Sequence, residues 1–205
     1  MNSRLHVVGT GSGYPDYTLP LGLKIIKKCQ VLVGGQRFIH NFAEAHHEIF
    51  YVKNNLPDVV AYLKSIYKEK ETCVLVSGDP GFYSFLGYLR QHFAAGELNV
   101  IPGISSISLA FAKLAESWHD ARLISLHGRS LDALSCLTPG QKIAILTDNK
   151  NTPSLVAQKL STVLGNDCRV TVCEALGTPQ ERLTTTTLDK VCDSDSVSLL
   201  VISHV

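Results

Sequence analysis

Short apolar runs alternate with longer amphipathic segments along the first half of this chain. The runs Leu5–Val8, Val31–Val33 and Val74–Val76 have the length and the β-branched content of buried strands. Segments with helical spacing lie between them, such as residues 56–68. Strands that alternate with helices predict a parallel sheet that is covered by helices on both faces.

The same pattern predicts further elements and a second domain. The expected strands are Leu5–Val8, Val31–Val33, Ile49–Val52, Val74–Val76, Leu98–Ile101, Arg122–Leu126, Lys142–Leu146, Arg169–Cys173, Arg182–Thr186 and Ser198–Ile202. The expected helices are Thr18–Lys28, with Thr18 as its cap, Gln36–Ala43, Asn55–Lys68, Phe85–Phe93, Ser105–Leu114, a short one near Asp132, and Pro153–Leu164. We therefore expect two α/β domains, residues 1–116 and 117–205, the second with a mixed parallel and antiparallel sheet.

Composition narrows the class of protein. Charged residues make up 18% of the chain and the formal net charge is +1, which does not favour a general nucleic-acid binder. No apolar stretch approaches the ~20 residues of a membrane-spanning helix. Six cysteines are scattered without a CxxC pair, so we expect a reduced, cytoplasmic protein without a zinc site.

Two loops rich in glycine and proline each follow a predicted strand and precede a predicted helix. They are Ser77–Tyr83 and Pro102–Ser106. If they leave neighbouring strands of one sheet, they form a crevice at the strand carboxyl ends, where open α/β sheets bind ligands. Asp79 is either a structural cap of its loop or a base.

A third loop, Gly9–Gly13, follows the first predicted strand. Its G-x-G-x-G spacing departs from the G-x-G-x-x-G dinucleotide fingerprint, and Gly34–Gly35 stands where that fingerprint needs an acidic residue. NAD binding is therefore disfavoured. Two interpretations stay open: a turn that needs positive φ, or a backbone surface that a bulky, flat ligand can approach.

The three loops, taken in order, resemble the tetrapyrrole methylases, the class III S-adenosylmethionine methyltransferases. Within that family, Val33–Arg37 and Ser125–Arg129 are similar to the branch that methylates C5 of a corrin precursor, precorrin-6Y or cobalt-precorrin-7. Ser12 stands where the family usually has proline. The alternatives are a family member with a different target carbon and a non-catalytic protein that binds a tetrapyrrole or a nucleotide.

The resemblance implies a homodimer, and a cleft between the two domains that holds S-adenosylmethionine. It implies that the cofactor contacts Gly78, Asp79, Pro80, Phe82, Tyr83, Pro102, Gly103, Ser105, Ser106, Thr147, Ala175 and Leu176. It also implies that the first glycine loop faces the macrocycle. The chain ends at Val205, so we expect methylation at C15, with its decarboxylation, to belong to a separate protein.

A corrin precursor carries many carboxylates, and arginine can grip a carboxylate with two parallel hydrogen bonds. We therefore expect Arg37, His127 and Arg129 to contact the substrate, and the resemblance adds Gly9, Gly11 and Gly13 of the first loop. For each arginine the alternative is a solvated surface side chain. His127 is a candidate base, carboxylate partner or axial metal contact, and otherwise a structural residue.

Overall fold

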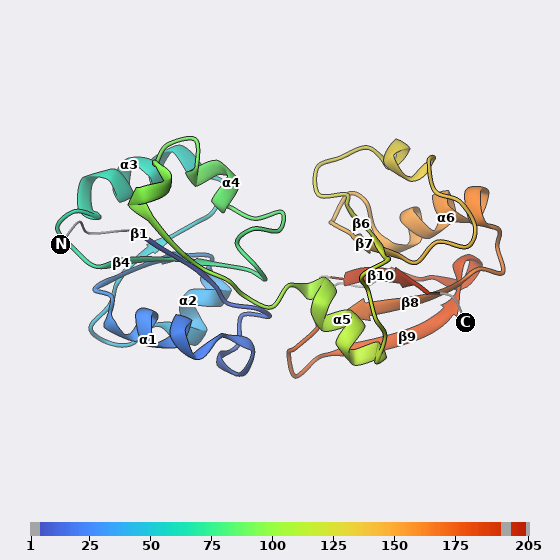
Figure 1. The fold of residues 1–205 in the computed structure, drawn as a ribbon, viewed down its shortest axis with the longest axis horizontal. Helices are drawn as coiled ribbons and strands as arrows, with labels where there is room; N and C mark the ends of the chain where they lie inside the picture. Colours follow the sequence, from blue (N-terminus) through green and yellow to red (C-terminus); the bar gives the residue numbers. More distant parts are fainter. Residues whose placement is uncertain (1–4, 194–197, 204–205) are drawn as a thin grey trace. The chain divides into compact units, whose positions relative to one another are not determined.

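A computed structural model of the chain describes residues 5–193 and 198–203. The chain divides into two compact units, Met1–Ser105 and Ser106–Val205, and each is described here by itself. Both units are built on a five-stranded sheet (Figure 1). No helix of the described part of the chain is long and apolar enough to span a membrane.

The sheet of the first unit is entirely parallel and has the strand order β3-β2-β4-β1-β5. Its elements are β1 (Leu5–Gly9), α1 (Pro20–Lys28), β2 (Val31–Gly34), α2 (Gln36–Phe42), β3 (Glu48–Tyr51), α3 (Leu56–Ile66), β4 (Thr72–Val76), α4 (Leu86–Leu89) and β5 (Leu98–Ile101), with short 3-10 turns at Pro15–Tyr17 and Ala95–Glu97.

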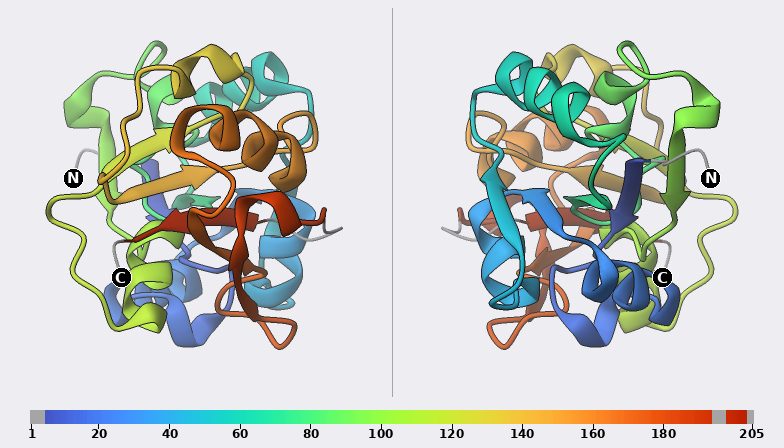
Figure 2. Two further views of the ribbon diagram at one scale, coloured as in Figure 1. Left: turned by 90° about the vertical axis from the view of Figure 1, so that its right-hand side faces the viewer. Right: turned by 90° about the vertical axis from the view of Figure 1, so that its left-hand side faces the viewer.

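Both faces of this sheet are buried because its strands are apolar at successive positions, and successive side chains point to opposite faces. Val74 and Val76 pack with Leu89 beside α3 and α4, whereas Cys73 and Leu75 pack with Ile26 beside α1 and α2. Figure 2 shows the two helix layers on opposite sides of the strands.

A topological switch point lies between β1 and β4. The chain leaves β1 through α1 on one face and reaches β2, whereas it leaves β4 through α4 on the other face and reaches β5. Loops that depart in opposite directions leave an opening at the strand carboxyl ends, where α/β sheets bind ligands.

The sheet of the second unit is mixed and has the order β6-β7-β10-β8-β9, in which only β6 and β7 pair in parallel. Its elements are α5 (Ser106–Leu114), β6 (Arg122–Ser125), β7 (Ile143–Leu146), α6 (Pro153–Leu164), β8 (Arg169–Glu174), β9 (Arg182–Thr187) and β10 (Ser198–Ile202), with 3-10 turns at Leu131–Leu134 and Leu188–Lys190.

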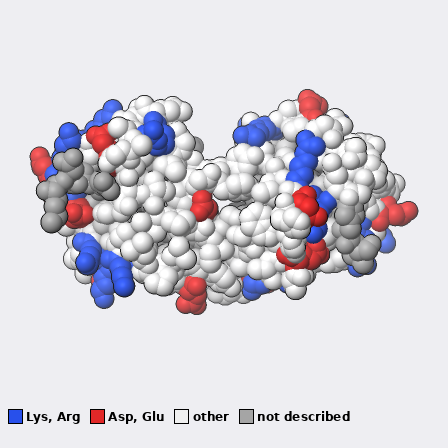
Figure 3. Space-filling view, viewed as in Figure 1, with Lys and Arg blue, Asp and Glu red and all other residues white. Residues whose placement is uncertain are grey.

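Helix α6 covers one face of the second sheet. Its buried Val156, Ala157 and Leu160 pack on strand side chains such as Ile145 and Leu200. Helix α5 lies against β10. On the face drawn in Figure 3, basic and acidic side chains are scattered over each unit, some of them side by side, and neither sign forms a continuous surface among the described residues.

The predicted fold class is confirmed: two α/β units, the second with a mixed sheet. Each predicted strand is present within one or two residues of its expected bounds. The structure divides the chain at Ser105, whereas the sequence placed the boundary near residue 116. Helix α5 accounts for the difference, because its Lys113 pairs with Glu181 of the second unit.

Two helix predictions were wrong in detail. Thr18 is not the cap of α1, which begins at Pro20 after Leu19, and the Thr18 hydroxyl instead donates to backbone carbonyls of the first glycine loop region. The helix expected over Phe85–Phe93 is reduced to α4, with turn-type bonds such as Gln91 N–H to the Tyr88 carbonyl after it. Gly87 lies within α4, and glycine has a low helix propensity.

Candidate functional site

Three loops meet at the carboxyl edge of the first sheet. They follow β1, β4 and β5, and they are residues 9–13, 77–83 and 102–106. The condition set for the second and third loops, that their strands β4 and β5 are neighbours, is not met: β1 lies between them and pairs with both. The first glycine loop is therefore the centre of the assembly.

Backbone hydrogen bonds join the first loop to the second. Gly11 and Gly78 form an isolated antiparallel bridge, in which the Gly78 N–H donates to the Gly11 carbonyl at 2.8 Å and the Gly11 N–H donates to the Gly78 carbonyl at 3.3 Å. Buried Thr10 adds two bonds to the Val76 carbonyl, from its N–H at 2.9 Å and from its hydroxyl at 2.8 Å. Both glycines have positive φ, near 60°, which favours glycine at these positions.

Glycine is also required where the first and third loops touch. A Cβ atom built on Gly103 would lie 2.1 Å from the Gly78 carbonyl oxygen and 2.8 Å from the Gly9 backbone. A Cβ atom on Gly9 would lie 2.7 Å from the Gly103 nitrogen. The three loops thus pack backbone against backbone, with no room for a side chain.

The Asp79 carboxylate joins the outer two loops. One oxygen accepts from the Gly81 N–H at 2.7 Å, within its own loop, and the other accepts from the Gly103 N–H at 3.1 Å. Of the two roles that the sequence left open, this geometry favours the structural cap over the base, because both oxygens serve backbone donors.

The first glycine loop is held in turn by α2 and by Thr18. The Asn41 amide donates to the Gly13 carbonyl at 2.8 Å, and the Thr18 hydroxyl lies 3.1 Å from the Thr10 carbonyl. A Cβ atom on Gly13 would lie 3.6 Å from Nε of Arg37. The structure therefore places Arg37, whose side chain is exposed, beside the first glycine loop, as the proposed substrate role requires.

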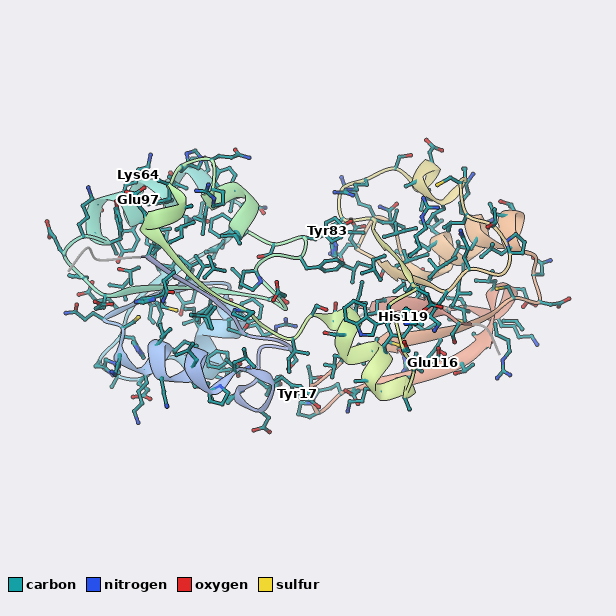
Figure 4. The ribbon with its side chains drawn as sticks, viewed as in Figure 1. Tyr17, Lys64, Tyr83, Glu97, Glu116 and His119 are labelled. Carbon is teal, nitrogen blue, oxygen red and sulfur yellow. The ribbon has the colours of Figure 1, made fainter. Side chains whose placement is uncertain are left out.

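Tyr83 has a strained backbone at the end of the second loop. Its φ of 47° lies in the left-handed region that side chains other than glycine rarely adopt. Tyr83, labelled in Figure 4, is 48% exposed, and its ring meets that of Phe82 edge to face with centroids 4.7 Å apart. Such strain tends to cluster at ligand-binding segments.

Two buried hydroxyl oxygens of the described residues make no hydrogen bond, those of Ser12 and Ser84. One lies in the first glycine loop and the other directly follows Tyr83. Buried polar groups are nearly always paired, so unpaired ones call for an explanation, and a polar ligand is one. The sequence analysis did not single out Ser84, since a lone serine carries no local signal.

In the second unit, the loop from His127 to Arg129 is exposed and follows β6. The Asp148 carboxylate accepts from the backbone N–H groups of Asn151 at 2.6 Å and Gly128 at 2.9 Å, and these bonds hold its pKa below the ordinary value. The Asn151 amide donates to the Leu126 and Arg129 carbonyls at 2.7 and 3.0 Å. The loop after β7 therefore fixes the backbone that carries His127 and Arg129.

His127 has a partner of its own. Its Nδ1 lies 3.1 Å from the hydroxyl of buried Ser125. Because this contact engages Nδ1, the ring is oriented and Nε2 is the nitrogen left for a proton or a carboxylate. Neither Ser125 nor Asn151 was identified as a supporting residue by the sequence analysis.

Three predicted cofactor contacts of this unit, Thr147, Ala175 and Leu176, have clear structural surroundings. The Thr147 hydroxyl is buried and donates to the Ser198 carbonyl at 2.7 Å. Ala175, which follows β8, has a φ of 46°, and Leu176 beside it is buried. Glu174 ends β8 in a two-pronged pair with Arg182 of β9, at 2.6 and 2.8 Å.

The predicted residues thus form one contiguous group in the first unit, on the three loops with Arg37 beside them. In the second unit they lie on the loops after β6, β7 and β8. Loops at a switch point are where open α/β sheets bind ligands. The model of the family described as Tetrapyrrole (Corrin/Porphyrin) Methylases matches residues 4–192, and the chain belongs to that family.

Curated relatives cover much of the chain. A Methanocaldococcus jannaschii protein named probable cobalt-precorrin-7 C(5)-methyltransferase is 28% identical over 96% of this chain and 95% of its own length. The Salmonella typhimurium cobalt-precorrin-7 C(5)-methyltransferase is 30% identical over 76% and 77%. A Sinorhizobium precorrin-6Y C(5,15)-methyltransferase is 34% identical over 88% of this chain, which spans 44% of that relative's length.

Solved structures share the fold. The methyltransferase CobJ superposes with a TM-score of 0.83 at 20% identity, covering 97% of this chain and 93% of that one. A precorrin-6Y methylase from Archaeoglobus fulgidus gives 0.74 at 19% identity and covers 98% of each chain. The uroporphyrin-III C-methyl transferase of Thermus thermophilus, complexed with S-adenosylhomocysteine, gives 0.77 at 20% identity over 97% and 96%.

Proposed function

We propose that this protein transfers a methyl group from S-adenosylmethionine to C5 of a corrin precursor, cobalt-precorrin-7 or precorrin-6Y. The observation that carries the proposal is the three-loop assembly at the switch point, in a chain that belongs to the tetrapyrrole methylases. The choice of C5 rests on the names of the relatives from Methanocaldococcus and Salmonella.

The loops of the first unit suit a cofactor with an adenosine and an amino-acid end. Their backbone groups approach a ligand closely because the second and third loops carry glycine and proline, and the unpaired Ser84 hydroxyl offers a further hydrogen bond. When bound, S-adenosylmethionine would supply an electrophilic methyl group on its sulfonium, with the thioether S-adenosylhomocysteine as the leaving group. We assign cofactor binding to the second and third loops, with Thr147, Ala175 and Leu176 contributing.

The substrate contacts fall to the remaining residues. The first glycine loop, with Gly9, Gly11 and Gly13, is assigned to the macrocycle on the family resemblance, and Arg37, which lies beside Gly13, suits a carboxylate. In the second unit, Arg129 provides a second carboxylate partner. His127, oriented through Nδ1 by Ser125, is the candidate to accept the proton that leaves the ring system.

This division of roles needs no strong catalytic base. Displacement at a sulfonium methyl depends mainly on holding the two reactants in line and keeping water away. The residues accordingly act by positioning: the loops fix the cofactor, and the arginines fix the macrocycle through its carboxylates.

The decisive experiment incubates the protein with isotope-labelled S-adenosylmethionine and purified precorrin-6 and precorrin-7 intermediates, with and without cobalt. We expect the label at C5, located by NMR. Label at another carbon would identify a family member with a different target. Binding of both molecules without transfer would identify a carrier instead.

Three further proposals concern the location of the protein, its oligomeric state and the methylation at C15. We propose a cytoplasmic location, which the six free cysteines favour, and a homodimer, which rests on the family resemblance. Light scattering on the purified protein tests the dimer. We also propose that a separate protein performs the C15 methylation, and product analysis in the same incubation tests this, since a product methylated at C15 would contradict it.

A further inference from the structure

The turn after β8 contains a strained residue that is not glycine. Ala175 has a φ of 46°, and Gly177, two residues later, has a φ of 69°. The left-handed conformation is unfavourable for alanine, because its Cβ crowds the following carbonyl oxygen. It persists only where its surroundings determine it, and such residues cluster at functional sites.

Hydrogen bonds from Thr178 and Glu181 determine this turn. The Ala175 carbonyl accepts from the Thr178 hydroxyl at 2.7 Å and from the Thr178 N–H at 3.1 Å. The Gly177 N–H donates to Oε2 of Glu181 at 2.7 Å, and the Glu181 N–H donates to the Thr178 carbonyl at 3.0 Å. Residues 175–181 therefore form a closed loop, with the Glu181 carboxylate at its base.

The second oxygen of that carboxylate reaches a different element. Oε1 of Glu181 lies 2.7 Å from Nζ of Lys113, on the last turn of α5. The Glu181 side chain is only 20% exposed, so this ion pair is less screened than a surface pair. Glu181 thus connects the strained turn to α5, and each of its two carboxylate oxygens takes part in this connection.

We propose that Glu181, held by Lys113, is a positioning residue that sets the Ala175–Gly177 turn for binding S-adenosylmethionine. The inference rests on the proposed function, in which Ala175 and Leu176 contact the cofactor. Glu181 and Lys113, which the sequence motifs did not indicate, thus affect cofactor affinity without contacting the cofactor.

The test measures the affinity of S-adenosylhomocysteine by calorimetry at a temperature where every variant is folded. Glu181→Ala removes both contacts and is expected to weaken binding roughly tenfold, the effect of losing one charge-assisted hydrogen bond. Glu181→Gln keeps an acceptor for Gly177 but loses the ion pair, so a smaller loss is expected. Asp167→Asn, an exposed change in the same unit, is the matched control and is expected to leave the affinity unchanged.

Variants of Lys113 distinguish a positioning role of Glu181 from a general loss of stability. Lys113→Met should weaken binding as Glu181→Gln does, and the double variant should be no worse than either single one, because both remove the same contact. Lys113→Arg keeps the charge and should restore most of the affinity. Additive losses, or an arginine variant no better than methionine, would overturn the assigned coupling.

A further variant separates this inference from the proposed function. Ala175→Val places a β-branched side chain in the left-handed region and distorts the turn itself. If it weakens S-adenosylhomocysteine binding while Glu181→Ala does not, the positioning role is wrong and the cofactor role of the turn stands. If Ala175→Val and Leu176→Ala both leave the affinity unchanged, the turn does not contact the cofactor and the proposed site is wrong there.

Discussion

The carboxylate of Asp79 accepts a hydrogen bond from the backbone N–H of Gly103, 24 residues further along the chain, although strand β1 lies between their strands. The contact is possible because Gly9, at the end of β1, has no side chain to separate them. Because this hydrogen bond reaches across an intervening strand, the conformation of the second loop depends on that of the third. Three tests of this assembly follow.

Gly103→Ala should destabilise the first unit. The added Cβ would lie 2.1 Å from the Gly78 carbonyl oxygen, and overpacking of this kind costs about 1–3 kcal/mol. Chemical denaturation measures the loss. Gly87→Ala is the matched control: a Cβ there meets nothing within 4 Å, and alanine favours helix α4, so we expect unchanged or slightly higher stability.

Asp79→Ala should separate the second loop from the third. Two backbone N–H groups lose their acceptor, so we expect about tenfold weaker S-adenosylhomocysteine binding by calorimetry. Asp79→Asn keeps one carbonyl acceptor, so its affinity for S-adenosylhomocysteine should lie between those of wild type and Asp79→Ala. If Asp79 were a catalytic base instead, the asparagine variant would bind as wild type does and lose only turnover.

Ser84→Ala should affect the free protein and the complex differently. The Ser84 hydroxyl is buried and unpaired, so its removal should leave the free energy of unfolding unchanged or raise it slightly. Cofactor affinity should fall if the hydroxyl bonds to the ligand. Ser12→Ala removes the other unpaired hydroxyl, from the loop assigned to the substrate, and should leave cofactor affinity unchanged. Equal affinities for wild type and Ser84→Ala would remove Ser84 from the site.

Arg129→Ala should raise KM for the corrin precursor by about tenfold, since a charge-assisted carboxylate contact is lost, while the affinity for S-adenosylhomocysteine stays nearly constant. Steady-state kinetics and calorimetry give the two values. Arg169→Ala, at the exposed start of β8, is the control. If Arg129→Ala raises KM and weakens S-adenosylhomocysteine binding to a similar extent, Arg129 is a structural residue.

Acidification should weaken the loop that carries His127 and Arg129. The pKa of Asp148 is lowered in the folded protein because the Asn151 and Gly128 N–H groups donate to it, so the native state binds fewer protons than the unfolded chain. Its contribution to stability is therefore present above the usual value of 3.8 and is lost as the pH falls through the lower, folded value.

Urea unfolding at several pH values between about 6 and 3 tests this dependence. Asp148→Asn should be less stable than wild type at the upper end and should approach it at the lower end, because the wild-type carboxyl is then protonated too. A constant difference across the range would mean that the Asp148 charge does not contribute.

The local pattern of apolar and polar residues was enough to predict the strands and most helices, because hydrophobic periodicity indicates which faces are buried. The three loops were identified for the same reason, since glycine and proline follow strand-like runs there. The order of strands was not predictable in this way: nothing near Leu5 or Leu98 says that β1 pairs with β5 as well as with β4. Pairing between distant segments is decided by the whole sheet.

The supporting residues were missed for a related reason. Glu181 and Lys113 lie far apart in the sequence, and an acidic or basic residue on a loop or helix is usually a solvated one. Thr18 has the residue type of a helix cap, but Leu19 holds the cap position of α1, and the Thr18 hydroxyl bonds to the Thr10 and Tyr14 carbonyls. Tertiary contacts outweighed local preference in each case.

The central place of β1 also has a consequence for how the protein is made. His6 lies beside Cys73 on one side and beside Asn99 on the other, so β1 has neither of its partners until much of the first unit has been synthesised. The nascent chain must carry an unpaired, largely apolar segment through that interval. Slowing translation before β4 should therefore lengthen its exposure to aggregation, whereas slowing it after β5 should not.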